Sequence, residues 1–320
     1  MVPASGGHGP HPRCVVAIGT FQVSLSPLSG KTEMIVIVGS IVVVGAVLGG
    51  FILSGGQIGA LVHPTEILTI GGAALGALII MSPVKVLKDL VKGLLSTLKG
   101  SPFSKKAYDE LFKVLYEFLR LARQDGLIAL EPHLSNPHES SIFHKYPLIG
   151  NNHHVSDFIC GAFSPAVEGS ATPEQLEALL AIDLKTIEEE HHGPLGVLSK
   201  TADGLPGFGI VAAVLGIVIT MGAIDGPVTE IGEKVGAALV GTFLGILASY
   251  GFIGPLVGRM ESMGAEELAF FRTISSVVLA FVKNLPPKVA IDQARRGLAS
   301  NLRPSREELD VLFKAVESNA

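Results

Sequence analysis

The sequence predicts an all-α, polytopic membrane protein with four transmembrane helices and a helical cytoplasmic domain between the second and the third. The composition is the first observation: 48% of the 320 residues are hydrophobic, 17% are charged and the mean hydropathy is +0.49, whereas about 25% of a soluble domain is charged. The second is a set of four uncharged runs, each about 18 residues or longer, which is enough to cross a bilayer. The third is the content of 38 glycines, with small residues spaced four apart as in closely packed membrane helices.

The four predicted spans form two pairs. The first span is 34–53 and the second is 67–84, which follows Pro64 at a position that suits the first turn of a helix. The third is 205–224 and the fourth is 235–258. None of them contains Asp, Glu, Lys, Arg or His. A buried helix of a soluble protein rarely reaches this length without a charge, so we expect all four to cross a membrane.

The distribution of Lys and Arg predicts the orientation. The segment 82–204 holds twelve of them and the tail 257–320 holds nine, whereas the short connection 54–63 holds none and 225–234 holds one. Positively charged loops stay in the cytoplasm. We therefore expect a multi-pass membrane protein with both termini and the long middle segment in the cytoplasm.

The chain divides accordingly into five parts. Residues 1–33 are rich in Gly, Pro, Ser and His and show no helical period, so they are expected to be a disordered N-terminal extension or a start-site artefact. The other parts are transmembrane helices 1 and 2 (34–82), the cytoplasmic helical domain (83–204), transmembrane helices 3 and 4 (205–258) and a cytoplasmic C-terminal tail (259–320).

The stretch 83–100 is amphipathic, with Lys85, Lys88 and Lys92 on one face and leucines and valines on the other. A basic amphipathic helix beside a span can lie along the anionic inner leaflet. It can equally well continue the second span into the cytoplasm, and the sequence does not decide between the two.

Three further cytoplasmic helices are predicted from their periodicity and end signals. One covers 105–126 and ends at Gly126, a good C-terminal cap. Another begins at Thr172, with proline in its first turn, and continues to about Glu190. The last one lies in the tail, where Ser305 and Glu308 fit a capping box.

The sequence argues against several classes of function. A net charge of −5 gives no basic field for nucleic acid. The two cysteines, Cys14 and Cys160, are far apart, and the seven histidines between 133 and 192 lack the helical spacing of metal ligands. We therefore expect no metal, no cofactor and no catalytic residues, and the chain is not expected to be an enzyme.

The absence of ionisable groups from the spans has two interpretations. The chain is either a structural anchor, or a partner helix supplies a carboxylate while this chain supplies packing and a polar lining. Thr242 and Ser249 on the fourth span are candidates for such a lining, although a lone threonine more often bonds a carbonyl of its own helix. Pro206 and Pro255 stand at the cytoplasmic ends of the last two spans. In one interpretation each proline only begins or ends a helix. In the other, the two prolines lie at the same depth in the membrane and form a hinge between the membrane and the cytoplasmic domain.

Six stretches carry a resemblance that covers the chain from Met34 onward. They are "GGFILSGGQIGALVHPTE", "RQDGLIALE", "NPHESSIFHKYP", "PGFGIVAAVLG", "VGTFLGILASYGFIGPL" and "PPKVAIDQARRGLASNLRPSREEL". In this order they resemble the MotA family of flagellar stator proteins, within the wider MotA/TolQ/ExbB group of proton channels. The ExbB and TolQ energisers of outer-membrane processes are the alternative. They have three spans and lack the "RQDGLIALE" block, so the MotA family is favoured.

The resemblance implies roles for six residues. Arg123 and Glu131 occupy the places of charges that interact with the rotor protein FliG. Pro206 and Pro255 occupy the places of prolines that couple ion passage to cytoplasmic movement. Two further residues fall at channel-facing positions, Ala213 and Thr242.

The resemblance also implies the partners and the transported ion. In the family, a homo-oligomeric ring of MotA chains surrounds a dimer of MotB, whose single transmembrane helix carries the ion-binding aspartate. Sodium-driven relatives tend to have a threonine at the position of Ala213. The alanine found there therefore favours protons, since a sodium ion needs several oxygen ligands.

Overall fold

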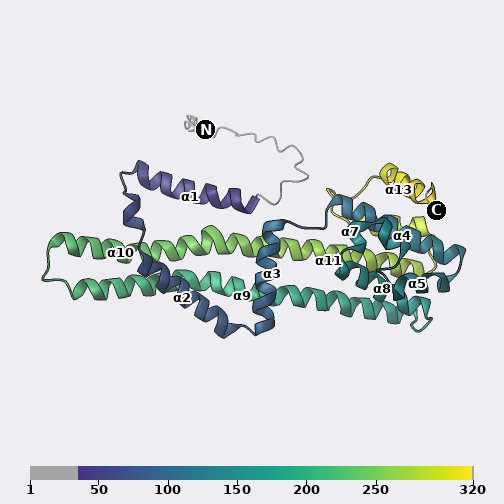
Figure 1. Ribbon diagram of the computed structural model, residues 1–320, viewed down its shortest axis with the longest axis horizontal. Helices are drawn as coiled ribbons and strands as arrows, with labels where there is room; N and C mark the ends of the chain where they lie inside the picture. Colours follow the sequence, from purple (N-terminus) through teal and green to yellow (C-terminus); the bar gives the residue numbers. More distant parts are fainter. Residues whose placement is uncertain (1–34, 319–320) are drawn as a thin grey trace, which may run out of the picture.

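The computed structural model describes residues 35–318, and within them it contains helices and no strands. The predicted extension 1–33 lies outside the described residues. Figure 1 shows an elongated molecule, with long helices running from one end to a cluster of shorter helices at the other. The elements up to the cluster are α1 (Ile35–Leu53), the short η2 (Ile58–Leu61), α2 (Pro64–Met81) and α3 (Val84–Lys99).

The remaining elements form the cluster and the long helices. They are α4 (Lys105–Gln124), η3 (Leu127–Leu130), α5 (Glu131–Ser135), α6 (Ser141–Lys145), α7 (Pro147–Gly150), α8 (His153–Val167), α9 (Pro173–Met221), α10 (Val228–Ile246), the π-helix η4 (Leu247–Ile253), α11 (Gly254–Val282), α12 (Pro287–Arg296) and α13 (Arg306–Ser318).

Four segments are long and apolar enough to cross a membrane: α1, 58–81, α9 and the continuous run from α10 to α11. These are the four predicted spans. The capping predictions are also confirmed: Pro64 stands in the first turn of α2, Thr172 and Gln175 form a capping box at α9, and Ser305 and Glu308 form one at α13. Helix α4 ends at Gln124, just before Gly126, whose φ of +88° suits glycine.

The predicted cytoplasmic helix from Thr172 to about Glu190 and the third span are one helix. Helix α9 runs for 49 residues without a break, a length of about 73 Å at 1.5 Å per residue, so it extends far beyond a bilayer of about 30 Å. Pro194 reads as a helix breaker, but it is buried inside α9. The part of α9 around Pro194 packs against α3 and α11.

The first two spans pack differently against this long pair. Helix α2 lays Ile70 and Ala74 against Leu205 and Ala212 of α9. Helix α1 has no buried residue, and it approaches the rest of the chain where Val43 lies beside Gly251. Its apolar surface is therefore left for lipid or other chains to cover.

Helix α3 does not continue the second span. The backbone is extended at Ser82 and Pro83, where α2 ends, and α3 then lies across α9 and α11, nearly perpendicular to them (Figure 1). An ion pair of 3.0 Å between Lys85 and Glu190 joins its first turn to α9. Of the two interpretations of 83–100, the structure supports a helix that lies across the spans.

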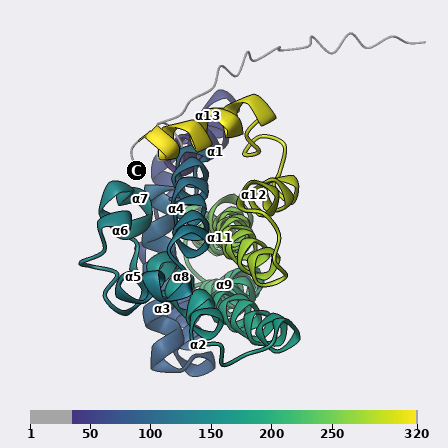
Figure 2. The same cartoon turned by 90° about the vertical axis from the view of Figure 1, so that its right-hand side faces the viewer.

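The cytoplasmic core surrounds α4. Viewed end-on, α7 lies on one side of α4 and α11 and α12 lie on the other, with α13 across the top of the view (Figure 2). Phe112, Phe118, Phe163 and Phe271 belong to this core and are fully buried. One end of α11 is part of this core, while its other end continues the membrane-spanning helix.

Candidate functional site

The C-terminal part of α9 is in backbone contact with α10. A Cβ added to Gly245 would lie 2.6 Å from the carbonyl oxygen of Leu205 and 2.9 Å from Cα of Gly209. A Cβ added to Gly216 would lie 2.7 Å from Cβ of Ala238. The close packing predicted from small residues four apart is therefore confirmed in this hairpin, which we call the glycine seam.

The two predicted channel-facing residues lie on the glycine seam. The backbone nitrogen of Ala213 is 3.5 Å from the Cβ position of Gly241, and Cα of Thr242 is 3.3 Å from that of Gly209. Thr242 is half-buried, and its hydroxyl forms no hydrogen bond with any residue between 35 and 318, whereas Thr220 bonds a carbonyl of its own helix. The Thr242 hydroxyl is thus available to another group.

A carboxylate of this chain also reaches the glycine seam. Glu66 shares one face of α2 with Ile70 and Ala74, and its Oε2 lies 3.0 Å from the Cβ position of Gly241. The sequence places Glu66 just outside the second span. Figure 1 shows that the hairpin of α9 and α10 extends past the start of α2. The first turn of α2 therefore contacts the hairpin partway along its length and not at its tip.

Pro206 lies inside α9 and leaves one carbonyl without its usual donor. The N–H of residue 206 would bond the carbonyl of Ala202, but proline has no N–H. The hydroxyl of Ser249, in η4, donates to this carbonyl at 2.6 Å, and Ser249 is 2% exposed. Ser249, one of the two candidates for a polar lining, thus has a buried hydroxyl that joins η4 to α9 at the proline.

Pro255 lies at the start of α11, directly after the π-helix. The N–H of Gly254 bonds the carbonyl of Ser249, five residues back. Such π-helical turns inside longer helices occur often at functional sites. The stretch from Ser249 to Pro255 is thus the irregular part of the fourth span.

The expectation that the two prolines stand at the same depth is wrong. Helices α9 and α10–α11 are antiparallel, and the Ser249–Ala202 hydrogen bond fixes their register. Pro206 lies four residues from this bond toward the turn between α9 and α10, and Pro255 lies six residues from it in the opposite direction. The prolines are therefore about 15 Å apart along the helix axes. Pro206 in α9 and Pro255 after the π-helix thus lie on opposite sides of the hydrogen bond between Ser249 and Ala202.

The Ser249 hydrogen bond should matter because of Pro206. Ser249→Ala leaves the buried carbonyl of Ala202 unpaired, so we expect the free energy of unfolding to fall by about 1–3 kcal/mol. Pro206→Ala returns an N–H to that carbonyl, so the same serine change should then cost at least about 1 kcal/mol less. Denaturant unfolding of the purified variants measures the coupling. Thr220→Ala is the control, and its effect on the free energy of unfolding should add to that of Pro206→Ala. If the effects of Ser249→Ala and Pro206→Ala were also additive, this account would be contradicted.

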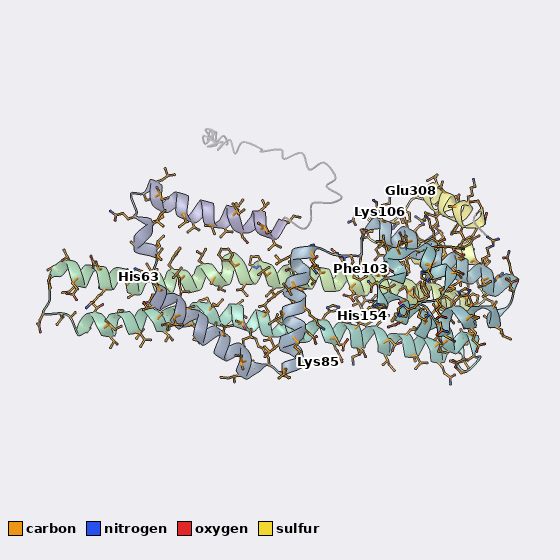
Figure 3. The ribbon with its side chains drawn as sticks, viewed as in Figure 1. His63, Lys85, Phe103, Lys106, His154 and Glu308 are labelled. Carbon is orange, nitrogen blue, oxygen red and sulfur yellow. The ribbon has the colours of Figure 1, made fainter. Side chains whose placement is uncertain are left out.

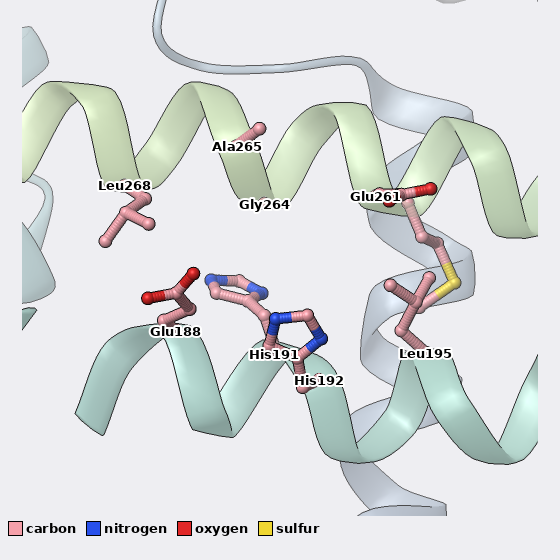
Figure 4. Close-up of a pocket in the computed structure, with 9 residues that line it drawn as sticks. Glu188, His191, His192, Leu195, Glu261, Gly264, Ala265 and Leu268 are labelled. Carbon is pink, nitrogen blue, oxygen red and sulfur yellow. The ribbon is translucent and has the colours of Figure 1, made fainter. Parts of the chain in front are cut away.

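A second contact joins α9 to α11 near α3. Nε2 of His191 lies 3.1 Å from Oε2 of Glu267, and the imidazole lies 3.4 Å from the position that a Cβ on Gly264 would take. Figure 4 shows the imidazole pointing toward α11 at Gly264, beside a hollow of about 220 Å³. The hydrogen bond with Glu267 raises the pKa of His191, against partial burial, and the charge of Glu190 acts in the same direction.

This contact should make the stability depend on pH. Because the pKa of His191 is raised in the folded state, the pair stabilises the fold fully below pH 6.5 and loses this contribution as the pH rises through the raised value. The His191 side chain is 43% exposed, so we expect less than about 1 kcal/mol. Thermal unfolding across this range should show the decline, and Glu267→Gln should remove it. His192→Gln should retain it, and an unchanged decline in Glu267→Gln would refute the assignment.

The first of the two predicted rotor-facing charges is Arg123, which lies in the last turn of α4. It is exposed, and its guanidinium donates to the backbone carbonyls of Asn284 and Leu285, each at 3.1 Å. These carbonyls belong to the turn after α11, where Asn284 has a φ of +63°. A shallow hollow of about 280 Å³ lies between Arg123 and this turn. Arg123 therefore binds the end of α11 in addition to being exposed.

The second is Glu131, the first residue of α5, which is also exposed. It forms no ion pair with any residue that the structure describes. Between Arg123 and Glu131, the side chain of Ile128 is 77% exposed. The two charges therefore lie at the end of α4 and the start of α5, but of the two only Arg123 also contacts another element among the described residues.

Sequence reasoning missed three contacts at these sites. The bond from Ser249 to Ala202 could have been found, because a serine in an apolar span can supply the donor that a proline in a neighbouring helix lacks. The pairs His191–Glu267 and Arg123–Asn284 join residues far apart in the chain. No local pattern marks such pairs.

Family models and relatives match most of the chain. Residues 37–126 match the family model described as "Motility protein A N-terminal", and residues 151–277 match the MotA/TolQ/ExbB proton channel family. Motility protein A of Salmonella typhimurium is 36% identical over 285 residues, which is 89% of this chain and 97% of that protein. The chemotaxis protein LafT of Vibrio parahaemolyticus is 38% identical over 272 residues, 85% of this chain and 95% of that protein.

Solved structures share the fold. The C. jejuni MotAB structure matches with a TM-score of 0.71 at 22% identity, over 85% of this chain and 99% of the other. The flagellar MotAB stator complex of Bacillus subtilis matches with a TM-score of 0.67 at 24% identity, over 86% and 98%. Two family models in the expected order and relatives of this similarity over nearly the whole chain lead to one conclusion: the chain belongs to the motility protein A (MotA) family.

Proposed function

We propose that this chain, a subunit of the bacterial flagellar stator, forms an ion channel with MotB and converts ion flow into torque on the rotor. One observation carries the proposal. Helix α11 begins at Gly254 and Pro255, directly after the π-helix that follows α10, and it ends at Val282, just before the two carbonyls that Arg123 binds. A change at the membrane can therefore reach the exposed charges through one helix and two hydrogen bonds.

The MotB helix is proposed to lie against the glycine seam and to supply the aspartate. Relatives are known from structures of MotAB complexes. The seam offers the free hydroxyl of Thr242 and the small side chain of Ala213. Moving one charge across the membrane potential supplies about 2.3 kcal/mol per 100 mV. This energy can shift a two-state hinge if protonation of the partner carboxylate favours one state.

We propose further that several copies of this chain form a ring around a MotB dimer. The apolar surface of α1, which has no buried residue, supports contact with neighbouring copies. The positive charge of the middle segment and the tail supports an orientation with both termini in the cytoplasm. The exposed Arg123 and Glu131 would then face the rotor protein FliG.

Complementation tests the proposal. A strain that lacks its own stator genes should regain swimming when this chain is expressed with the MotB of the same organism, and should not when the MotB aspartate is replaced by asparagine. Membrane levels of both chains serve as the control. Normal assembly without any motility would contradict the proposal. The match of 37–126 to the motility-specific model weighs against an ExbB- or TolQ-like energiser.

The complemented strain also tests the ion. Ala213 lacks the hydroxyl that a threonine at this position would offer to a sodium ion. Swimming should therefore be unchanged when potassium replaces sodium at fixed membrane potential and pH. It should slow when the proton gradient is collapsed. Swimming speed that saturates with external sodium would instead show sodium coupling.

A further inference from the structure

Helix α3 has three distinct faces. Leu90 and Thr97 are buried against the long helices, and Gly93 lies beside the methyl group of Met260 in α11. A second face is apolar and exposed, and we call it the apolar ridge. Its exposed fractions are 69% for Val84, 56% for Val91, 55% for Leu95 and 44% for Leu98.

The third face is a row of lysines beside the apolar ridge. Lys88, Lys92 and Lys99 are exposed, and at 100° per residue they fall within one narrow stripe of the helix. None of the three forms an ion pair with any residue between 35 and 318. Lys85, which continues the row, is paired with Glu190 of α9 and holds the start of α3 in place (Figure 3).

The position of α3 brings these faces to the membrane surface. The chain leaves the second span at Met81, and α3 begins three residues later and runs across the spans (Figure 1). A helix in this place, with one face packed on protein, presents its other faces at the level of the lipid headgroups. Apolar side chains can then enter the acyl region while lysines remain among the headgroups.

We propose that α3 is a binding surface for anionic phospholipids of the inner leaflet, with the apolar ridge in the acyl region and Lys88, Lys92 and Lys99 on the headgroups. The acidic group on the same helix is Asp89, and Glu190 is already paired with Lys85. Lys88, Lys92 and Lys99 outnumber the single Asp89 and form no ion pair within residues 35–318, so phosphate is the complementary group.

The absence of tryptophan from the chain allows a direct test. The full-length Leu95→Trp variant is reconstituted in vesicles of phosphatidylglycerol and phosphatidylcholine, in which either lipid alone carries brominated acyl chains. The indole should be quenched by both lipids and about twofold more by phosphatidylglycerol. Val91→Trp serves as a second reporter if Leu95→Trp does not fold. Val311→Trp, exposed on α13, is the control that neither lipid should quench.

The lysines are tested in the same reporter. Changing Lys88, Lys92 and Lys99 to glutamine should make the two lipids quench equally. The same change at Lys106, Lys185 and Lys314, which are exposed on the cytoplasmic body, should leave the preference intact. An unquenched reporter on α3 would overturn the proposal. So would equal quenching with the lysines present, or a preference that survives their removal.

Discussion

Arg123→Glu is expected to stop swimming, and an opposite charge on the rotor is not expected to restore it. The substitution removes two charge-assisted hydrogen bonds to the carbonyls of Asn284 and Leu285, each worth about 1.5–3 kcal/mol when buried and less at this exposed site. It also places a carboxylate beside two carbonyl oxygens. Both the rotor contact and the end of α11 are therefore disturbed.

Glu131→Lys separates these two effects. Glu131 is exposed and forms no ion pair within residues 35–318, so its reversal should change only the rotor contact. We expect reduced swimming that an opposite charge on the rotor partly restores. Tethered-cell torque at high load and swimming at low load measure both variants at equal membrane levels, with Lys106→Glu as a control on the same helix as Arg123. Equal rescue of Arg123→Glu and Glu131→Lys would show that the contact with the turn has no role.

Gly245→Val is expected to abolish folding of the hairpin. The nearest atoms to an added Cβ are backbone atoms, the carbonyl oxygen of Leu205 at 2.6 Å and Cα of Gly209 at 2.9 Å. Because no side chain can rotate away, α9 and α10 would have to separate. We expect a loss of at least about 3 kcal/mol in the free energy of unfolding, with little protein in the membrane.

Gly236→Val is the matched control. It lies on the same helix, and no atom lies within 4 Å of its Cβ position. The same substitution should therefore cost less than about 1 kcal/mol. Membrane levels and resistance of the purified chains to denaturant give the comparison. Similar levels for the two variants would mean that the backbone contact at Gly245 is not needed.

Local signals in the sequence sufficed for the spans and the helix ends. The four spans follow from uncharged length, and the capping boxes at Thr172 and Ser305 need only residues that are close in sequence. The resemblance named the residues of the candidate site. Their roles in ion flow and torque stay predictions, supported by the exposure of Arg123 and Glu131 and by the free hydroxyl of Thr242.

The remaining features depend on contacts between distant residues. Pro194 reads as a break between two helices, yet it is buried inside a continuous α9 that packs against α3 and α11. The depth of Pro255 relative to Pro206 depends on the register of two antiparallel helices, which the Ser249–Ala202 bond reveals. The sequence of α3 suits either a helix along the inner leaflet or a continuation of the second span. The extended backbone at Ser82 ends α2 and excludes the continuation.

The hydrogen bond from Ser249 divides α9 into two arms of unequal length. From Ala202 the helix extends about 44 Å to Pro173 and, if Pro173 lies in the cytoplasm as we propose, about 28 Å to Met221 on the outer side. If α9 pivots at this bond as a stiff rod, its cytoplasmic end travels about 1.5 times as far as its outer end. The helix is then a lever that exchanges force for travel, and the position of Ser249 sets its mechanical advantage.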